Sequence, residues 1–217
     1  FILVNKWKLF RFNKIFKIHV NMAFLAKLIG AICLYYIYTE YYRERQTADI
    51  FKFYDDSREL SAVFFSNPLD YFKIIVGYYE KEFFYDYFIN MNHWDNSYES
   101  VITNESRVVI KLSSIFNIIN NNVYAVNVLL FTLFGFIGNI LILKAIDKIH
   151  PIKHFSYLFW SIMMFPSIFL WTSGILKEPI IFFGLGLLFY GIGNYYHTKT
   201  DLKKHIVFIL IGLIILL

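Results

Sequence analysis

The chain has 217 residues, of which 58% are hydrophobic and 17% are charged, and its formal net charge is +5. Soluble domains usually carry about 45–50% apolar and about 25% charged residues. This composition therefore excludes a disordered chain, a collagen-like fibre and an ordinary soluble enzyme. A single cysteine, Cys33, excludes a disulfide framework and a zinc site built from cysteines. The positive net charge alone would fit a nucleic-acid binder, but the placement of the basic residues indicates a membrane protein, and no nucleic-acid partner is expected.

Long apolar segments predict transmembrane helices, because about 20 helical residues are needed to cross the hydrocarbon layer. They predict an all-α, polytopic membrane protein with about five transmembrane helices, the first at residues 22–39 and the others within 123–217. Lys27, the one charge in the first helix, is expected to extend toward the membrane surface. The later helices are expected at Val123–Leu143, Phe155–Trp171, Pro179–Tyr195 and from Ile206 onward.

The last apolar segment has only twelve residues, from Ile206 to Leu217, which is short for a crossing. We expect the sequence to be the N-terminal piece of a longer protein. The alternative is a short closing helix or a re-entrant one.

Lysine and arginine set the expected orientation, since they are enriched in cytoplasmic loops. Residues 1–21 hold five basic residues and no acid, and they have the pattern of a basic amphipathic segment on the inner leaflet. Further lysines lie between the second and third helices and between the fourth and fifth. Residues 40–122 hold 8 basic and 13 acidic residues, so this segment is expected outside and the N-terminus in the cytoplasm.

The outer segment, 40–122, is too long for a structureless connection and is rich in aromatic residues. Apolar residues at helical spacing predict a helix over 48–65, with Thr47 as its N-cap. Asn67-Pro68 marks a break, and further helices are expected over 68–88 and 105–121 around a polar turn at 90–100. Aromatic faces beside a membrane favour helices that lie in its interface.

Three aspartates lie early in the segment that follows the first transmembrane helix. Asp49 and Asp56 are seven residues apart, which places them on one face of a helix, and Asp55 is adjacent. A carboxylate there could act as a general base on a hydroxyl, or carboxylates could hold a divalent cation. The alternative is that Asp49 only stabilises the helix N-terminus and that Asp55 and Asp56 are solvated.

Basic residues in the outer segments form two further clusters. Lys177 and Glu178 follow Gly174, where an outer turn enters a helix, and the lysine could bind a lipid phosphate. The alternative is that the pair marks the end of a helical hairpin. Arg107 and Lys111 are one helical turn apart and could hold a diphosphate, although surface charges are commoner. His93, the only outer histidine, is expected to be an exposed loop residue.

This arrangement resembles the multi-span membrane glycosyltransferases of the GT-C class. The likeness is closer to bacterial polytopic proteins with a D-x6-D motif after the first span and an F-P-S-x3-W-x-S-G-x2-K-E motif further on. The first motif is Asp49 to Asp56 here. The second is Phe165-Pro166-Ser167, Trp171, Ser173-Gly174 and Lys177-Glu178, and the likeness covers about Met22 to Tyr195.

The resemblance implies an enzyme of the bacterial inner membrane that uses a polyprenyl-phosphate-linked sugar donor and a glycan or lipid acceptor. Asp49 would then be the base that activates the acceptor hydroxyl, and Asp56 or Asp55 would orient the acceptor or bind a metal. Lys177, with Arg107 in support and Glu178 beside it, would bind the phosphate that leaves. No cofactor is implied with certainty, and a divalent cation is a candidate.

Two other functions are compatible with the sequence. A polysaccharide polymerase would join whole lipid-linked repeat units at the same kind of outer site. A non-catalytic membrane subunit of an envelope assembly would tolerate substitution of Asp49, Asp56 and Lys177.

Overall fold

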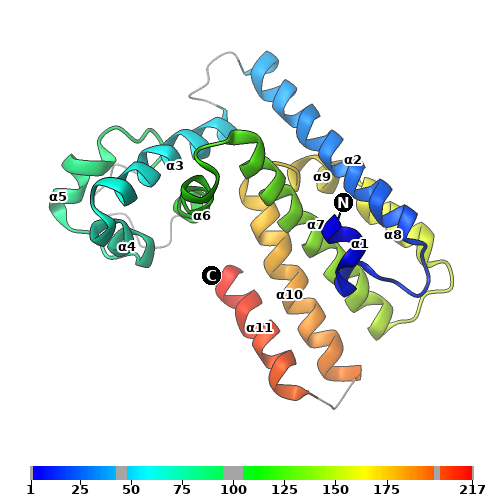
Figure 1. Ribbon diagram of the computed structural model, residues 1–217. Helices are drawn as coiled ribbons and strands as arrows, with labels where there is room; N and C mark the ends of the chain where they lie inside the picture. The colour runs from blue at the N-terminus through cyan, green and yellow to red at the C-terminus, as the bar shows by residue number, and fades with distance from the viewer. Residues whose placement is uncertain (1, 43–47, 95–104, 198–200, 217) are drawn as a thin grey trace. The chain divides into compact units, whose positions relative to one another are not determined.

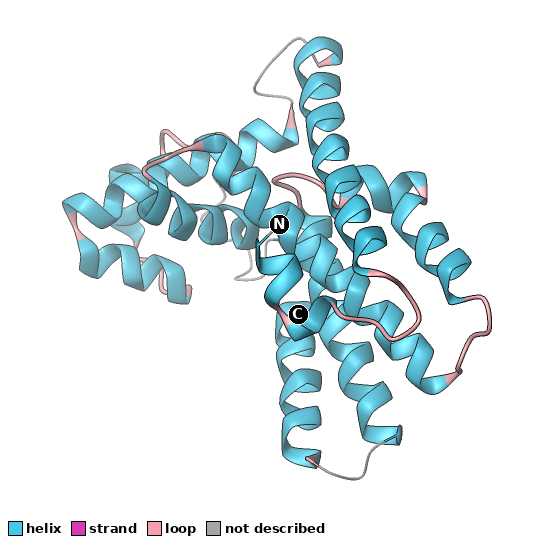
Figure 2. Cartoon of the chain, turned by 45° about the vertical axis from the view of Figure 1, so that its right-hand side comes forward, coloured by secondary structure: helices cyan, strands magenta, loops and turns pink. Residues whose placement is uncertain are grey.

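The protein is all-helical. The computed structural model describes residues 2–42, 48–94, 105–197 and 201–216, and no strand occurs among them (Figure 2). Helix makes up 82% of the structure, which confirms the predicted class. The elements, labelled where there is room in Figure 1, are α1 (Ile2–Lys6), η1 (Lys8–Phe10), α2 (Lys17–Tyr36), η2 (Ile37–Tyr41), α3 (Asp49–Ser66), α4 (Pro68–Val76), α5 (Lys81–Phe83), η4 (Phe84–Phe88), α6 (Glu105–Asn120), α7 (Tyr124–Ile149), α8 (Phe155–Met164), α9 (Pro166–Trp171), α10 (Lys177–His197) and α11 (Leu202–Leu216).

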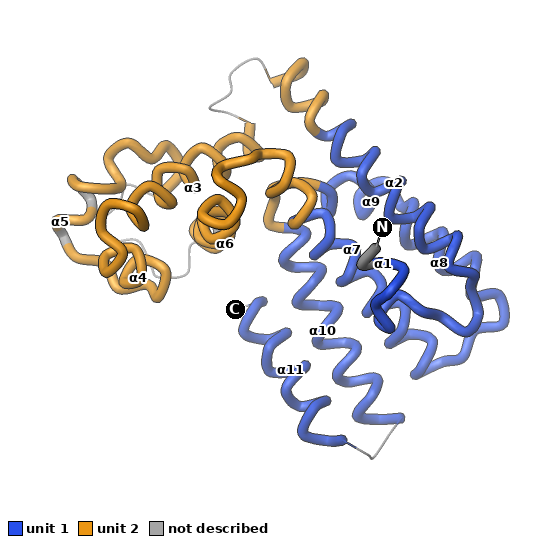
Figure 3. The backbone as a smooth tube through the Cα atoms, in the orientation of Figure 1, with its two compact units in different colours: residues 1–34, 131–173, 178–217 blue, residues 35–130, 174–177 orange. Residues whose placement is uncertain are grey.

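The chain divides into two compact units (Figure 3). Unit 1 contains residues 1–34, 131–173 and 178–217, and unit 2 contains residues 35–130 and 174–177. The segment predicted to lie outside the membrane, 40–122, therefore belongs to unit 2, together with the short turn that leads into α10.

Three helices in the described ranges are long and apolar enough to cross a membrane. They are Lys17–Tyr41, which is α2 extended by the π-helix η2, then α7 and α10. The predicted third span is divided at Phe165, whose extended ψ of 121° precedes Pro166, into α8 of 10 residues and α9 of 6. The last helix, α11, has 15 residues. The structure thus supports a membrane protein, but it does not confirm five spans.

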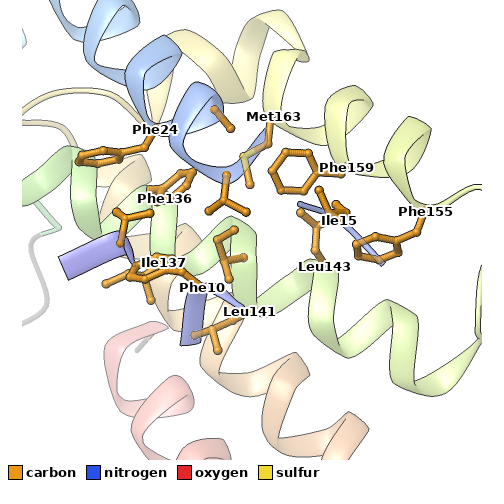
Figure 4. Close-up of a cluster of buried hydrophobic side chains, with 14 of the residues drawn as sticks. Phe10, Ile15, Phe24, Phe136, Ile137, Leu141, Leu143, Phe155, Phe159 and Met163 are labelled. Carbon is orange, nitrogen blue, oxygen red and sulfur yellow. The ribbon is translucent and has the colours of Figure 1, made fainter. Parts of the chain in front are cut away.

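The N-terminal residues differ from the expected amphipathic helix. Helix α1 and the 3-10 turn η1 are short, and residues 11–16 are not helical. The reason is that aromatic residues of this segment are drawn into the core of unit 1. Phe10 is fully buried, and its ring stacks on that of Phe136 at 5.7 Å (Figure 4). The ring of Phe12 contacts those of Phe155 and Phe159.

Glycines allow the apolar helices of unit 1 to approach closely. On α10, Gly186 lies so near α7 that a Cβ would meet the backbone oxygen of Gly138 at 2.6 Å. On another face of α10, a Cβ at Gly191 would meet the backbone oxygen of His205 in α11 at 2.9 Å. Close backbone contact between small residues is a main source of helix association in lipid, where burial of apolar side chains gains little. Helix α10 is therefore packed tightly on both α7 and α11.

Lys27 is buried within unit 1, contrary to the expected extension toward the membrane surface. Its ammonium group donates to the carbonyl oxygen of Ile168 at 2.5 Å and to the hydroxyl of Thr172. These acceptors lie at the C-terminal end of α9, where a positive charge is favoured. Gly30 allows α2 to approach α9 closely enough for these bonds, because a Cβ at this position would meet the Phe169 carbonyl oxygen at 2.9 Å.

Unit 2 is built on α3 packed against α6 through a buried polar network. Ser57 donates to Ser113 at 3.0 Å, and Asn117 donates to Ser57 at 2.8 Å. Asn127, at the start of α7, donates to Asn117 and Ser113. The four side chains are almost completely buried, and each bond replaces one that water would make. The network thus fixes α3, α6 and the first turn of α7 relative to one another.

The predicted helix over 68–88 is interrupted after Val76. Gly77 has φ 96°, a left-handed conformation that ends α4, and the chain resumes as α5 and η4. Asn67 caps α4, as its side chain accepts from the amide of Asp70, so the predicted break at Asn67-Pro68 is confirmed. The predicted N-cap Thr47 lies outside the described residues.

Many aromatic residues of unit 2 form its own core instead of an outer apolar face. Phe53, Tyr71, Phe88 and Trp94 are all buried. Large apolar side chains of α4 and of the end of α3 are nevertheless exposed: Phe65, Leu69, Phe72 and Val76. Within α4, the spacing of three and four residues places Leu69, Phe72 and Val76 on one helical face.

The close packing of α10 on α7 yields a stability prediction. Gly186→Ala inserts a methyl group against the backbone of Gly138, and overpacking of this kind costs about 1–3 kcal/mol. At Gly193, seven residues later on the same helix, the first contacts of a Cβ lie at 3.4 Å, so Gly193→Ala is the matched control. Thermal unfolding in detergent should show a lower midpoint for Gly186→Ala only. Equal effects of the two substitutions would contradict this packing.

Candidate functional site

The acidic residues of α3 lie in different surroundings. Asp49 begins the helix, its side chain is 52% exposed, and its carboxylate lies 3.5 Å from the ammonium group of Lys52. Asp55 is half-buried, whereas Asp56 is only 1% exposed. The predicted helix and its spacing are confirmed, but only Asp49 presents a carboxylate that a substrate in water could readily reach.

Asp56 holds the loop that follows η4. Its two carboxylate oxygens accept from the backbone amides of Asn92 at 2.9 Å, His93 at 2.7 Å and Trp94 at 2.8 Å. Bonds to an ionised acceptor are about twice as strong as bonds between neutral groups. Asp56 is thus not a solvated residue, and its main action in this structure is to fix the backbone of residues 92–94.

Trp94, which Asp56 holds in place, is part of an aromatic wall beside α6. The indole ring stacks on Phe88 at 4.7 Å and meets the ring of Tyr79 edge-on at 5.8 Å. The guanidinium carbon of Arg107 lies 5.3 Å from the centres of both the Trp94 and Tyr79 rings. Arg107 is 5% exposed, so it is not an ordinary surface charge.

Lys111, one turn after Arg107, lies against the same wall. Its ammonium nitrogen is 5.3 Å from the centre of the Tyr79 ring. Partial burial, with a contribution from the like charge of Arg107, lowers the pKa of Lys111 to about 8. Burial also raises the pKa of Tyr79, and the positive charge of Arg107 opposes that change. Two cations are therefore held together where water stabilises them poorly, which makes this pair a candidate anion-binding site.

The structure adds His93, which sequence reasoning set aside as an exposed loop residue. Its Nε2 atom is buried and has no hydrogen-bond partner among the described residues. Burial lowers the pKa of His93, while the carboxylates of Asp56, Asp49 and Asp55 oppose this from nearby on α3. Nothing in the sequence pairs His93 with these acids, because the loop is brought to α3 by the backbone bonds to Asp56.

The second predicted motif forms the turn into α10. Thr172, Ser173 and the following residues up to Leu176 are buried, and Gly174 has φ 146°, so the turn predicted at this glycine is present. Lys177 and Glu178 are both half-buried in the first turn of α10. Lys177 belongs to unit 2, as do Asp49, Asp56 and Arg107, whereas Glu178 belongs to unit 1.

A cation site receives no support from the described part of the chain. No group of three or more histidine, cysteine, aspartate or glutamate side chains there is placed to hold a metal ion. The predicted carboxylates Asp49, Asp55 and Asp56 therefore do not form a ready-made ligand set in this structure.

Comparisons of the chain with protein-family models, with curated proteins and with solved structures find no match. The family suggested by the two motifs is therefore a hypothesis that rests on the residues alone.

Removal of the hydrogen bonds that Asp56 accepts should loosen the backbone of residues 92–94. Asp56→Asn replaces one accepting oxygen by an amide that cannot accept, and leaving buried donors unpaired costs about 1–3 kcal/mol each. Hydrogen exchange at residues 91–94 should become markedly faster. Asp49→Asn, at an exposed position of the same helix, should leave this exchange unchanged. Unaltered exchange in Asp56→Asn would show that other contacts hold the loop.

The lowered pKa of Lys111 predicts a stability effect with a definite sign. Between about pH 8 and 10.5 the unfolded chain keeps a proton that the folded chain has released, so this group makes stability rise with pH. At pH 7.5 the charged Lys111 disfavours folding, so Lys111→Met should raise the thermal midpoint. The same substitution should reduce the increase of the thermal midpoint between pH 7.5 and pH 10.

Lys73 supplies the matched control for that measurement. Its ammonium group also lies over a ring, that of Phe83 at 5.6 Å, but it is paired with Glu80 at 2.9 Å and with Asp70 at 3.3 Å. These partners raise the pKa of Lys73, so Lys73→Met should not stabilise the fold. If both substitutions change the thermal midpoint in the same direction, the proposed cost of the Lys111 charge is wrong.

Proposed function

We propose that this chain is a membrane glycosyltransferase of the GT-C type, or the part of one that contains its outer site. It would move a sugar from a polyprenyl-phosphate-linked donor to a glycan or lipid acceptor outside the bacterial inner membrane. The observation that carries the proposal is the poorly solvated pair Arg107 and Lys111 against the Tyr79–Trp94 wall. A donor phosphate would supply negative charge beside Lys111, whose charged form is disfavoured by burial.

The reaction needs a base as well as a phosphate site. In the proposed step the acceptor hydroxyl attacks the anomeric carbon of the sugar, its proton passes to Asp49, and the bond from that carbon to the phosphate oxygen breaks. Asp49 suits this role better than Asp56, because its carboxylate is exposed and accepts no backbone amide bond from the described residues, whereas three occupy Asp56. The leaving phosphate would be neutralised by Lys111 and Arg107, with Lys177 as a further candidate.

The surroundings of the site fit a substrate that arrives from a membrane. Helices α2, α7 and α10 are long enough to span, and we further propose that α8 with α9 forms one kinked crossing and that α11 belongs to a fifth. The positive-inside rule then places the N-terminus in the cytoplasm and unit 2 outside. The exposed apolar face of α4 would rest in the outer interface, as the aromatic content of the segment led us to expect.

Binding of the lipid donor can be tested with the complete chain in nanodiscs. The probes are polyprenyl phosphate and the uncharged polyprenol of the same length. We expect the phosphate form to bind more tightly, and Lys111→Gln to weaken that binding about tenfold or more, since a charge-assisted bond contributes about 1.5–3 kcal/mol. Lys73→Gln, the ion-paired control, should bind like the wild type. Equal binding of the phosphate and the alcohol would refute the donor class.

Catalysis requires a separate assay with radiolabelled polyprenyl-phosphate sugars and glycan acceptors. Asp49→Asn should abolish transfer while the thermal midpoint and the binding of polyprenyl phosphate persist. Full activity of this variant would remove Asp49 from the mechanism. A wild-type chain that binds the lipid but transfers no sugar, including whole repeat units, would favour the non-catalytic subunit.

A further inference from the structure

The N-terminal strap, defined here as residues 2–16, is held on unit 1 by inward-facing apolar side chains. Val4, Phe10 and Ile15 are buried in the same core as Phe24 and Phe136 (Figure 4). Lys14 adds an ion pair with Asp147 at 2.5 Å. The strap is therefore a fixed part of the bundle, and the orientation of its remaining side chains is set by these anchors.

The outward side of the strap is positively charged and aromatic. Lys6, Lys8 and Arg11 are exposed, as is Lys17 at the start of α2, and none of them makes an ion pair among the described residues. Trp7 and Phe16 lie between these cations in the sequence and are 50% and 80% exposed. A tryptophan or phenylalanine ring next to basic residues is typical of protein surfaces that contact lipid headgroups.

The acids of unit 1 do not neutralise this surface. Asp147 is paired with Lys14, and Asp201 is paired with Lys204. Glu178 lies in the first turn of α10 and makes no ion pair with the strap within the described residues. Within the described part of unit 1, Lys6, Lys8, Arg11 and Lys17 are thus exposed and not ion-paired, so they can attract an external anion.

An apolar stripe on α2 begins beside the strap. Its members alternate at spacings of four and three residues, lie on one helical face and are about half exposed: Ile18, Met22, Leu25, Ile29 and Ile32. Asn21 donates to the side chain of Asn5 at 3.0 Å, which places the end of α1 next to the first turns of α2. Lys6 and Lys17 therefore lie beside the N-terminal end of this stripe, where Ile18 begins it.

We propose that the strap and the stripe together form a binding site for an anionic phospholipid of the inner leaflet. The phosphate and headgroup would contact Lys6, Lys8, Arg11 and Lys17, Trp7 and Phe16 would lie at the headgroup level, and an acyl chain would run along the stripe of α2. The site should prefer anionic to zwitterionic lipids, because each basic residue is attracted to a negatively charged headgroup and gains no such attraction from a zwitterionic one. The site is in unit 1 and does not depend on the proposed transferase activity.

The test is native mass spectrometry of the complete chain titrated with phosphatidylglycerol or phosphatidylcholine of identical acyl chains. The wild type should retain phosphatidylglycerol preferentially. The double variant Lys6→Gln/Lys8→Gln, which leaves the buried anchors in place, should bind it about tenfold or more weakly. The wild type should lose the same preference when the salt concentration is raised, because the contacts are exposed.

A matched control removes two cations elsewhere on the same unit. Lys203→Gln/Lys204→Gln changes exposed residues at the start of α11 and should leave phosphatidylglycerol binding unchanged. If this control weakens binding as much as the strap variant, the attraction is a general effect of net charge and the site does not exist. Equal retention of the two lipids by the wild type, or unaltered binding in Lys6→Gln/Lys8→Gln, also overturns the proposal.

Discussion

The organisation of the candidate site depends on one buried carboxylate. Asp56 accepts three consecutive backbone amides, and this fixes residues 92–94 against α3. The fixed loop then sets the position of Trp94, whose ring completes the wall beside Arg107, and brings His93 near the acids of α3. Acidic, aromatic and basic groups from three parts of unit 2 are thereby connected through a residue whose own carboxylate is buried and already accepts three backbone amides.

The basic pair of α6 illustrates how function and stability can oppose each other. Arg107 and Lys111 repel one another, and burial against aromatic rings weakens their hydration, although contacts with the ring faces offset part of this cost. An ion-paired lysine such as Lys73 carries no comparable penalty. A protein retains a poorly solvated charge more readily where the charge has a ligand to bind, which is why Lys111, more than any carboxylate, guides the functional proposal.

Unit 1 is organised by close helix contacts and not by large side chains alone. Gly135 and Gly30 permit α7 and α2 to approach the last turn of α9, where Thr172 and Ile168 receive Lys27. Buried Asn139 on α7 has no hydrogen-bond partner among the described residues, so the polar groups of this bundle are not all satisfied. A buried amide in this state costs stability, because lipid cannot replace the missing bonds.

Hydrophobic length and spacing by themselves determined the all-helical class, the helices α3 and α6 and the long apolar helices α2, α7 and α10, because these patterns act over a few turns of one helix. The Asn67-Pro68 dipeptide determined the break between α3 and α4. The hydrophobic pattern also singled out Asp49, Asp56, Arg107 and Lys177 as charged residues outside the apolar segments. Only the tertiary structure decided that Asp56 fixes a loop, that Lys27 is buried and that His93 joins the acids. These outcomes depend on contacts between residues far apart in the chain, and the spacing of residues within a single helix carries no information about such contacts.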